Sequence, residues 1–145
     1  MFISIEPYRL SFDEVLSLLH ECDNSFDPPL SSHIDLEAYA KRLSDNAFFV
    51  LVKDDYGKVV AYTAYYLNQE GAFAFIPEIW VDDSCQRMGM GHKMISHLSI
   101  GAPEYVKCIR LEVRKNNEKA YCFYQKEGFV IAEDRDAKVL LEKTL

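Results

Sequence analysis

A glycine-bearing segment in the middle of the chain most narrowly restricts the fold. Ile79–Val81 has the pattern of a β-strand end, and a loop with Gly89 and Gly91 leads from it into a helix. Glycines at such a turn let backbone N–H groups converge without interference from Cβ atoms. The N-terminus of the following helix adds unpaired donors and the positive end of its dipole. The segment is therefore suited to bind an anion such as a phosphate.

Two well-known phosphate motifs do not fit this segment. The dinucleotide-binding fingerprint needs a third glycine where the chain has Met94. A P-loop needs Gly-Lys-Ser/Thr, but Gly91 is followed by His92. A lone Gly-x-Gly before a helix is also consistent with a tight turn and close packing, so the segment alone leaves both interpretations open.

The hydrophobic pattern around the loop indicates an α/β class. Strand-like and helical periods predict the order β-α-α-β-β-β-α-β-α-β-β. We expect a mixed, mostly antiparallel sheet of six to seven strands, flanked by about four helices. The expected strands are Phe2–Glu6, Phe48–Val52, Val59–Leu67, Phe73–Val81, the alternating stretch Ile109–Val113, Phe129–Glu133 and Ala137–Leu141.

Four amphipathic stretches supply the helices. The first begins at a capping box made by Ser11 and Glu14. The second carries apolar residues at helical spacing between residues 36 and 43. The third follows the glycine loop and ends at Gly101, and the fourth is Asn117–Glu127.

Composition and charge exclude several classes of protein. The chain has 16 basic and 23 acidic residues, a net charge of −7, which does not favour nucleic acid as a partner and slightly favours a cationic acceptor. The four cysteines and four histidines lack the spacing of a metal site. We see no signal peptide and no apolar run of the roughly 18 residues that a membrane helix needs. We therefore expect one cytoplasmic domain over residues 1–145, without a metal or a membrane partner.

A second motif downstream gives the glycine loop a family context. It comprises Asn117, Ala120, Phe123, Tyr124, Gly128 and Phe129. With both motifs in this order, the sequence resembles the GNAT superfamily of N-acetyltransferases. Gln86-x-x-Gly89-x-Gly91 matches the Q/R-x-x-G-x-G/A acetyl-CoA motif of that family, and the downstream series matches the segment that usually follows it. The resemblance covers residues 73–129, and the N-terminal half is similar only in the order of its elements.

The resemblance implies acetyl-CoA as the co-substrate. Backbone amides from Gln86 to His92 would hold the pyrophosphate, and the pantetheine arm would lie in a gap between residues 79–81 and 109–113. Main-chain donors near Val81 would polarise the thioester carbonyl. Asn117 would contact the cofactor arm, although a helix N-cap selects the same residue type. The cofactor-binding residues expected in this way are Ile79, Trp80, Val81, Gln86, Arg87, Met88, Gly89, Met90, Gly91, His92, Asn117, Ala120, Phe123 and Tyr124.

Two residues would carry the catalytic roles. Tyr124 stands where family members commonly have a tyrosine beside the sulfur, and its phenol can give a proton to the departing thiolate. Its alternative role is that of a core aromatic. Glu78 is the first candidate for the base that takes a proton from the amine, and Pro77 before it suggests an edge or bulged strand. Glu112, on the opposite face of its strand, ranks second, and a water relay is the third alternative.

The resulting expectation is acetyl transfer from acetyl-CoA to an amine by direct attack in a ternary complex. Small-molecule amines are favoured as acceptors, and family members often form homodimers. The alternatives are a non-catalytic acyl-CoA-binding sensor or subunit, O-acetylation, and a longer acyl donor. The aromatic residues that could line the acceptor pocket are Tyr62, Tyr65, Tyr66 and Trp80.

Overall fold

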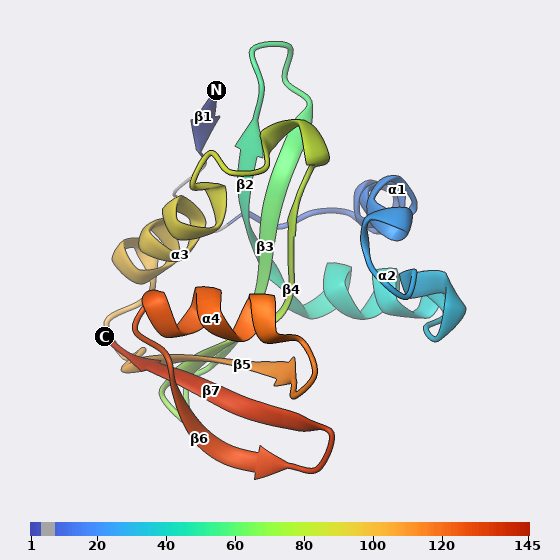
Figure 1. The fold of residues 1–145 in the computed structure, drawn as a ribbon. Coiled ribbons are helices and arrows are strands. Elements are labelled where there is room, and N and C mark those ends of the chain that lie inside the picture. The colour runs from blue at the N-terminus through green and yellow to red at the C-terminus, as the bar shows by residue number, and fades with distance from the viewer. Residues whose placement is uncertain (4–7) are drawn as a thin grey trace. The chain divides into compact units, whose positions relative to one another are not determined.

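The computed structural model describes residues 1–3 and 8–145, and its elements follow the predicted order (Figure 1). The sheet has seven strands in the order β1-β2-β3-β4-β5-β7-β6. The predicted α/β class is confirmed, and residues 4–6 of the predicted first strand lie outside the described residues. The strands are β1 (Phe2–Ile3), β2 (Phe48–Lys53), β3 (Val59–Asn68), β4 (Phe73–Val81), β5 (Cys108–Arg114), β6 (Val130–Arg135) and β7 (Lys138–Thr144). The helices are α1 (Phe12–Cys22), α2 (Leu36–Asn46), α3 (Met90–Gly101) and α4 (Glu118–Lys126).

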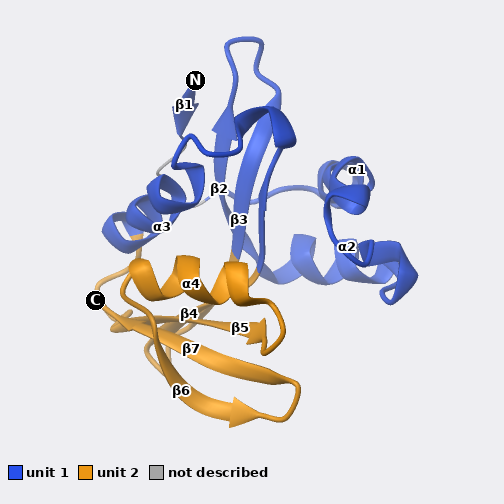
Figure 2. Cartoon of the chain, viewed as in Figure 1, with its two compact units in different colours: residues 1–64, 78–101 blue, residues 65–77, 102–145 orange. Residues whose placement is uncertain are grey.

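The chain divides into two compact units (Figure 2). The first unit comprises residues 1–64 and 78–101, and it contains α1, α2, β2 and α3. The second comprises residues 65–77 and 102–145, and it contains β5, α4, β6 and β7. Strands β3 and β4 contribute residues to both units. A single domain over residues 1–145 stays a prediction.

Local sequence signals explain where the first two helices begin. The Ser11 hydroxyl accepts the N–H of Glu14 at 3.2 Å, and the Glu14 carboxylate accepts the N–H of Ser11 at 3.0 Å. This is the predicted capping box. Asp35 caps α2 by accepting the N–H groups of Glu37 and Ala38. The buried residues of the two helices are Val15, Leu19, Cys22, Leu36, Tyr39, Ala40 and Leu43.

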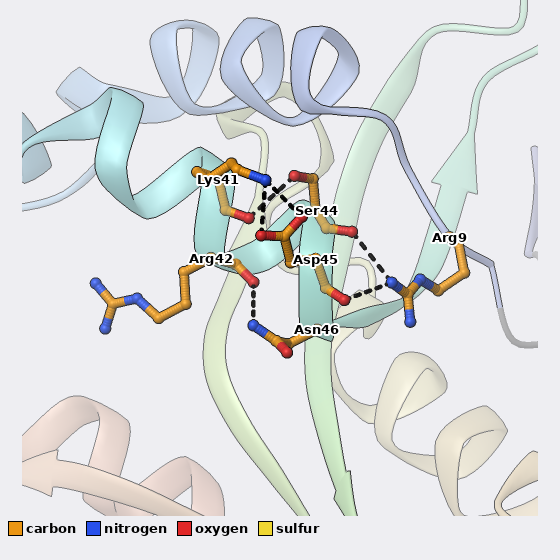
Figure 3. A network of polar contacts seen from close by, with 6 residues as sticks. All are labelled: Arg9, Lys41, Arg42, Ser44, Asp45 and Asn46. Atoms are coloured by element: carbon orange, nitrogen blue, oxygen red, sulfur yellow. Dashed lines mark hydrogen bonds and ion pairs between the residues drawn. The ribbon is translucent and has the colours of Figure 1, made fainter.

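Arg9 closes the C-terminal end of α2 (Figure 3). Its Nη2 atom donates to the carbonyl groups of Ser44 at 3.2 Å and Asp45 at 2.6 Å. Carbonyl groups in the last turn of a helix have no partner inside the helix, so the guanidinium replaces water there. Lys41 Nζ lies 2.9 Å from Asp45 Oδ2, one turn apart on the same helix. The segment before α1 is thus tied to the end of α2 within the first unit.

Strand β4 is interior to the sheet, because it lies between β3 and β5 in the strand order. Of the two alternatives predicted at Pro77, the edge strand is therefore wrong, and the bulged strand stays a prediction. The parallel pairs with β5 run from Phe73–Cys108 to Phe75–Arg110. Pro77 follows two residues after Phe75, beyond these pairs, where its missing N–H leaves no gap in them.

The second unit contains the predicted alternating strand. Ile109, Leu111 and Val113 of β5 are 0%, 3% and 6% exposed, whereas Glu112 is exposed. Strand β6 runs to Arg135, beyond the predicted end at Glu133, whereas β7 begins at Lys138, one residue after the predicted start at Ala137. Their charged turn is short, since Asp136 adopts the left-handed conformation at φ 61°.

Candidate active site

The loop after β4 has the backbone geometry of an anion-binding nest. Arg87 and Gly89 both adopt left-handed φ angles, 64° and 72°, with one residue between them. Backbone of alternating handedness turns successive N–H groups toward one point. Helix α3 begins at Met90, and the first N–H groups of a helix have no partner inside it. The loop can therefore hold an anion such as a pyrophosphate through its main chain.

Position 89 requires glycine because of its backbone conformation, not because a side chain would lack space. A Cβ atom built there would meet no heavy atom within 4 Å. The left-handed conformation costs a residue with a Cβ atom about 1–2 kcal/mol. Arg87 bears this cost in the same loop, and such strained residues cluster at ligand sites.

Two polar contacts anchor this loop to the ends of β3 and β4, and others hold it together from within. The Gln86 side-chain amide donates to the Val81 carbonyl at 2.9 Å. The N–H of Asp82 donates to the Val60 carbonyl at 2.8 Å. The Asp82 carboxylate accepts both the N–H and the hydroxyl of Ser84, and the hydroxyl contact holds the pKa of Asp82 below its ordinary value. Gln86 therefore shapes the loop from within.

Glu78 is a buried carboxyl on β4, three residues before the loop. Its side chain lies in the core, with the residue 8% exposed. Burial raises the pKa of Glu78 to about 7, although a hydrogen bond from Tyr39 opposes the shift. The Tyr39 hydroxyl donates to Glu78 Oε2 at 2.9 Å. A carboxyl with this pKa can gain and lose a proton near neutral pH, as a general base must.

The buried Glu78 carboxyl is expected to make the stability of the protein depend on pH. Its folded pKa of about 7 lies above the ordinary value of 4.5, so the folded state holds the proton more tightly than the unfolded state. The stabilising contribution is present below the ordinary pKa and is lost as the pH rises through about 7. Consider the unfolding free energy of Glu78→Gln minus that of the wild type. This difference should be more positive at pH 8 than at pH 4, by up to about 3 kcal/mol.

Urea unfolding of both proteins across this pH range measures that difference. Asp134→Asn, which changes an exposed carboxyl whose pKa is lowered by Lys115, is the matched control. Its destabilisation should be larger at high pH, the opposite direction. If the effect of Glu78→Gln on the free energy of unfolding does not vary with pH, the pKa of Glu78 is not raised in the folded protein, which contradicts the prediction.

Two neutral side chains of the first unit, Cys22 and Tyr62, lie close enough to Glu78 to feel its charge. Tyr62 and Trp80 are 1% and 4% exposed, and their ring centroids lie 5.8 Å apart. Cys22 Sγ lies 3.5 Å from the Tyr62 hydroxyl. Burial raises the pKa of Cys22 to about 11 and the pKa of Tyr62 well above its ordinary value, so both stay protonated at neutral pH. The indole N–H of Trp80 is buried and has no hydrogen-bond acceptor in residues 1–3 and 8–145.

The remaining predicted residues lie in the second unit, on and beside α4. Tyr124 is 7% exposed, and its ring packs edge-on against Phe123 and Phe129 at centroid distances of 5.1 and 5.4 Å. Asn117 is the N-cap of α4, since its side-chain oxygen accepts the N–H of Ala120 at 3.2 Å. Asn117 thus has the capping role that the sequence offered as an alternative.

The second candidate base, Glu112, is engaged in an ion pair. Its Oε2 atom lies 3.3 Å from Nη1 of Arg135, and the pair is exposed to solvent. Its carboxylate is thus already engaged by a guanidinium, whereas among the described residues Glu78 has only the Tyr39 hydroxyl as its hydrogen-bond donor. The environment of Glu78 is therefore better suited to a base than that of Glu112.

The structure brings the predicted residues together in two groups. Residues 78–81 and 86–92 lie in the first unit, and residues 117–124 lie in the second. Arg87 and Met88 are exposed, whereas Met90 is buried in the core. Tyr39 was missed as a site residue, because its spacing marks only the apolar stripe of α2. A buried tyrosine hydroxyl usually needs a hydrogen-bond partner, and this was the available signal for Tyr39. It does not tell which residue the partner is.

The predicted walls of an acceptor pocket are mostly core residues. Tyr62, Tyr65 and Trp80 are buried, and Tyr66 is half-buried. A hollow of about 450 Å³ lies elsewhere in the first unit, and no predicted site residue lines it. Its lining consists of Tyr8, Leu10, Asp13, Glu14, Ser17, Leu18, Leu51, Lys53, Gly57 and Val59.

Helices that could span a membrane and clusters of metal ligands are both absent from the described part of the chain. None of its helices combines the length and apolar character needed to cross a membrane. Nowhere in residues 1–3 and 8–145 do three or more His, Cys, Asp or Glu side chains gather as metal ligands would.

Comparison with known proteins decides the family. The model of the acetyltransferase (GNAT) family matches residues 12–129. The chain belongs to this family. The resemblance seen in the two sequence motifs is thereby confirmed, and acetyl transfer is the reaction class of the family. No curated protein sequence matches this GNAT chain significantly.

Solved structures share the GNAT fold at low sequence identity. PaiA N-acetyltransferase from Thermoplasma acidophilum, in complex with coenzyme A, is 15% identical over 100% of both chains, with a TM-score of 0.74. The ribosomal-protein-S18-alanine N-acetyltransferase from Escherichia coli is 20% identical, covers 99% of this chain and 92% of its own, and also has a TM-score of 0.74. A Bacillus anthracis protein assigned as a streptothricin acetyltransferase, with acetyl coenzyme A bound, is 22% identical over 69% of this chain and 63% of its own, with a TM-score of 0.60. At these identities the likeness shows the fold alone.

Proposed function

We propose that this protein transfers the acetyl group of acetyl-CoA directly to an amine in a ternary complex. The observation that carries the proposal is Glu78, a buried carboxyl with a pKa of about 7 on the strand that enters the glycine loop. An alkyl ammonium must lose a proton before its nitrogen can attack a thioester. A carboxylate that titrates near neutral pH is matched to this task.

Glu78 takes the proton from the acceptor ammonium, and the free nitrogen attacks the thioester carbonyl carbon. Main-chain N–H groups near Val81 stabilise the developing oxyanion. The C–S bond then breaks, and the electron pair leaves with sulfur. Tyr124 gives its phenolic proton to the thiolate, so that CoA departs as a thiol, and the tyrosinate recovers a proton when the acylated nitrogen loses its second proton to become the amide. Direct attack requires no acetylated enzyme, and an acetyl-cysteine that forms and decays during turnover would contradict it.

The glycine loop binds the pyrophosphate of acetyl-CoA in this proposal. The left-handed conformations of Arg87 and Gly89 and the N-terminus of α3 support it. The CoA and acetyl-CoA bound in two proteins of similar fold support the same co-substrate. The exposed Arg87 side chain adds a positive charge beside the phosphates.

Gly89→Ala is expected to weaken acetyl-CoA binding about 5- to 30-fold. The alanine escapes the left-handed conformation in the free protein, and binding then has to restore it at a cost of about 1–2 kcal/mol. Gly57→Ala is the matched control, because Gly57 has φ 83° and open space around its Cβ position but lies in the β2–β3 turn. Isothermal titration with acetyl-CoA measures both affinities. Equal affinities for the two variants would contradict the role of the loop.

The acceptor is proposed to be a small cationic amine. The net charge of −7 favours the approach of a cation, and neutral side chains around Glu78 leave its carboxylate as the local negative charge. The acceptors named for similar folds range from an alanine of a ribosomal protein to streptothricin, so the fold does not choose among them. Amine-dependent release of the CoA thiol tests the reaction and the acceptor class together.

A further inference from the structure

We propose that Tyr39 is a positioning residue for Glu78, whose hydroxyl holds the carboxylate in the orientation in which it takes the proton of the acceptor. The proposal rests on the proposed function, because it assigns Tyr39 a role through the base. The contact is direct, since the Tyr39 hydroxyl donates to Glu78 Oε2 at 2.9 Å. Both residues are buried, with Tyr39 6% and Glu78 8% exposed.

The placement of the two residues makes this contact selective. Tyr39 lies in the middle of α2 and Glu78 lies on β4, 39 residues later, so packing within the first unit brings them together. The hydrogen bond uses one carboxylate oxygen, Oε2, and restricts rotation of the group. The other oxygen, Oε1, can then accept the proton in a fixed direction. A base aligned in this way avoids reorganisation during the reaction.

The hydrogen bond also favours the charged form of the base. A donor to a carboxylate stabilises the ionised state, so the Tyr39 hydroxyl lowers the pKa of Glu78 against the larger effect of burial. Without this donor, less of the carboxyl would be ionised at neutral pH. Tyr39 therefore keeps a deeply buried carboxyl in the range in which it can act as a base.

Two other titratable groups that feel the charge of Glu78 come from α1 and β3. Cys22 on α1 and Tyr62 on β3 both feel the charge of Glu78, and they contact each other at 3.5 Å. Both are neutral at physiological pH, so neither competes with Tyr39 in fixing the charge of the base. The Arg42 guanidinium lies 5.3 Å from the centroid of the Tyr39 ring. The cation–π attraction between this guanidinium and the Tyr39 ring helps to fix the ring that carries the donor hydroxyl.

Tyr39→Phe tests this role through the pH dependence of the reaction. The phenylalanine keeps the ring and its packing but removes the donor. The acidic limb of kcat/KM should move to higher pH by about one unit, since a hydrogen bond to a charged group is lost. On the alkaline plateau, kcat should stay below wild type, because the carboxylate is ionised there but no longer held in one orientation, and KM for acetyl-CoA should not change. Carbon NMR of the glutamate carboxyls, with Glu78→Gln used to assign the signal, measures the same pKa change without turnover.

Tyr62→Phe is the matched control, because it removes a buried hydroxyl that contacts Cys22 instead of Glu78. It should leave the midpoint of the acidic limb and the Glu78 carbon signal in place. A Tyr39→Phe rate that falls equally at every pH, with an unmoved midpoint, would mean that Tyr39 has only a structural role. If Tyr62→Phe moves the midpoint of the acidic limb as far as Tyr39→Phe does, Tyr39 again has only a structural role.

Glu78→Gln separates a failure of this role from a failure of the proposed function. If the acidic limb disappears in Glu78→Gln but does not move in Tyr39→Phe, Glu78 is the base and Tyr39 does not position it. If Glu78→Gln keeps the wild-type rate and the same limb, the base lies elsewhere and both roles are overturned.

Discussion

Glu78→Gln lowers kcat/KM for amine acetylation by about two to four orders of magnitude, the usual contribution of a general base. The glutamine has the same size and can still accept the hydrogen bond of Tyr39, but it cannot take a proton. Acetyl-CoA affinity should change little, because the glycine loop is not altered. Thiol release at saturating acetyl-CoA, followed across pH, measures the effect.

The role of Glu78 as a base also predicts how kcat/KM depends on pH. The base is active when ionised, so the wild-type kcat/KM should rise with pH through about 7, the pKa of Glu78. The Glu78→Gln profile should lack this limb. Glu112→Gln decides between the two candidate bases, and its effect should stay below about threefold because its carboxylate is exposed and paired with Arg135. The reverse pattern would assign the base to Glu112, and two variants as active as wild type would favour a water relay.

Tyr124→Phe is expected to lower kcat by about two orders of magnitude, at the lower end of general acid effects. A thiolate is a tolerable leaving group, since a thiol has a pKa of about 8.5. The loss should therefore be smaller than for an alkoxide and should decrease as the pH rises above that value. Stopped-time assays at saturating concentrations of both substrates isolate kcat.

The matched control for Tyr124 is on the same helix. Tyr121→Phe removes the hydroxyl of a half-buried tyrosine one turn earlier on α4. It should retain activity within about twofold of wild type, since surface changes away from a site have small effects. A Tyr124→Phe variant as active as Tyr121→Phe would assign Tyr124 to the core, where it packs against Phe123 and Phe129.

Sequence reasoning succeeded where local chemistry determines the structure. The bounds of β4, Phe73–Val81, were predicted because turn residues precede it and the glycine loop follows it. The capping box of α1 depends on two side chains three residues apart, so it is visible in the sequence. The glycine loop is equally local, and its two left-handed residues fall within the predicted motif.

It failed where the answer depends on strand pairing or on tertiary packing. Pro77 suggested an edge or bulged strand, but β4 is not at an edge, because it lies between β3 and β5 in the strand order. The charges of Asp134 and Arg135 suggested a longer turn, yet both pair with β7. The burial of Glu78 and its contact with Tyr39 arise only when α2 packs within the first unit. No periodicity in the chain marks these two residues as partners.

Amine-dependent release of the CoA thiol from acetyl-CoA tests the central claim most directly. The panel should contain amino sugars, polyamines and peptides, and mass spectrometry should locate the acetyl group on the product. We expect thiol release that depends on a cationic amine, with one acetyl group per thiol placed on nitrogen, and strong loss of release in Glu78→Gln. Acetyl-CoA that does not bind, or that binds and yields no thiol with any amine, would contradict the proposed function.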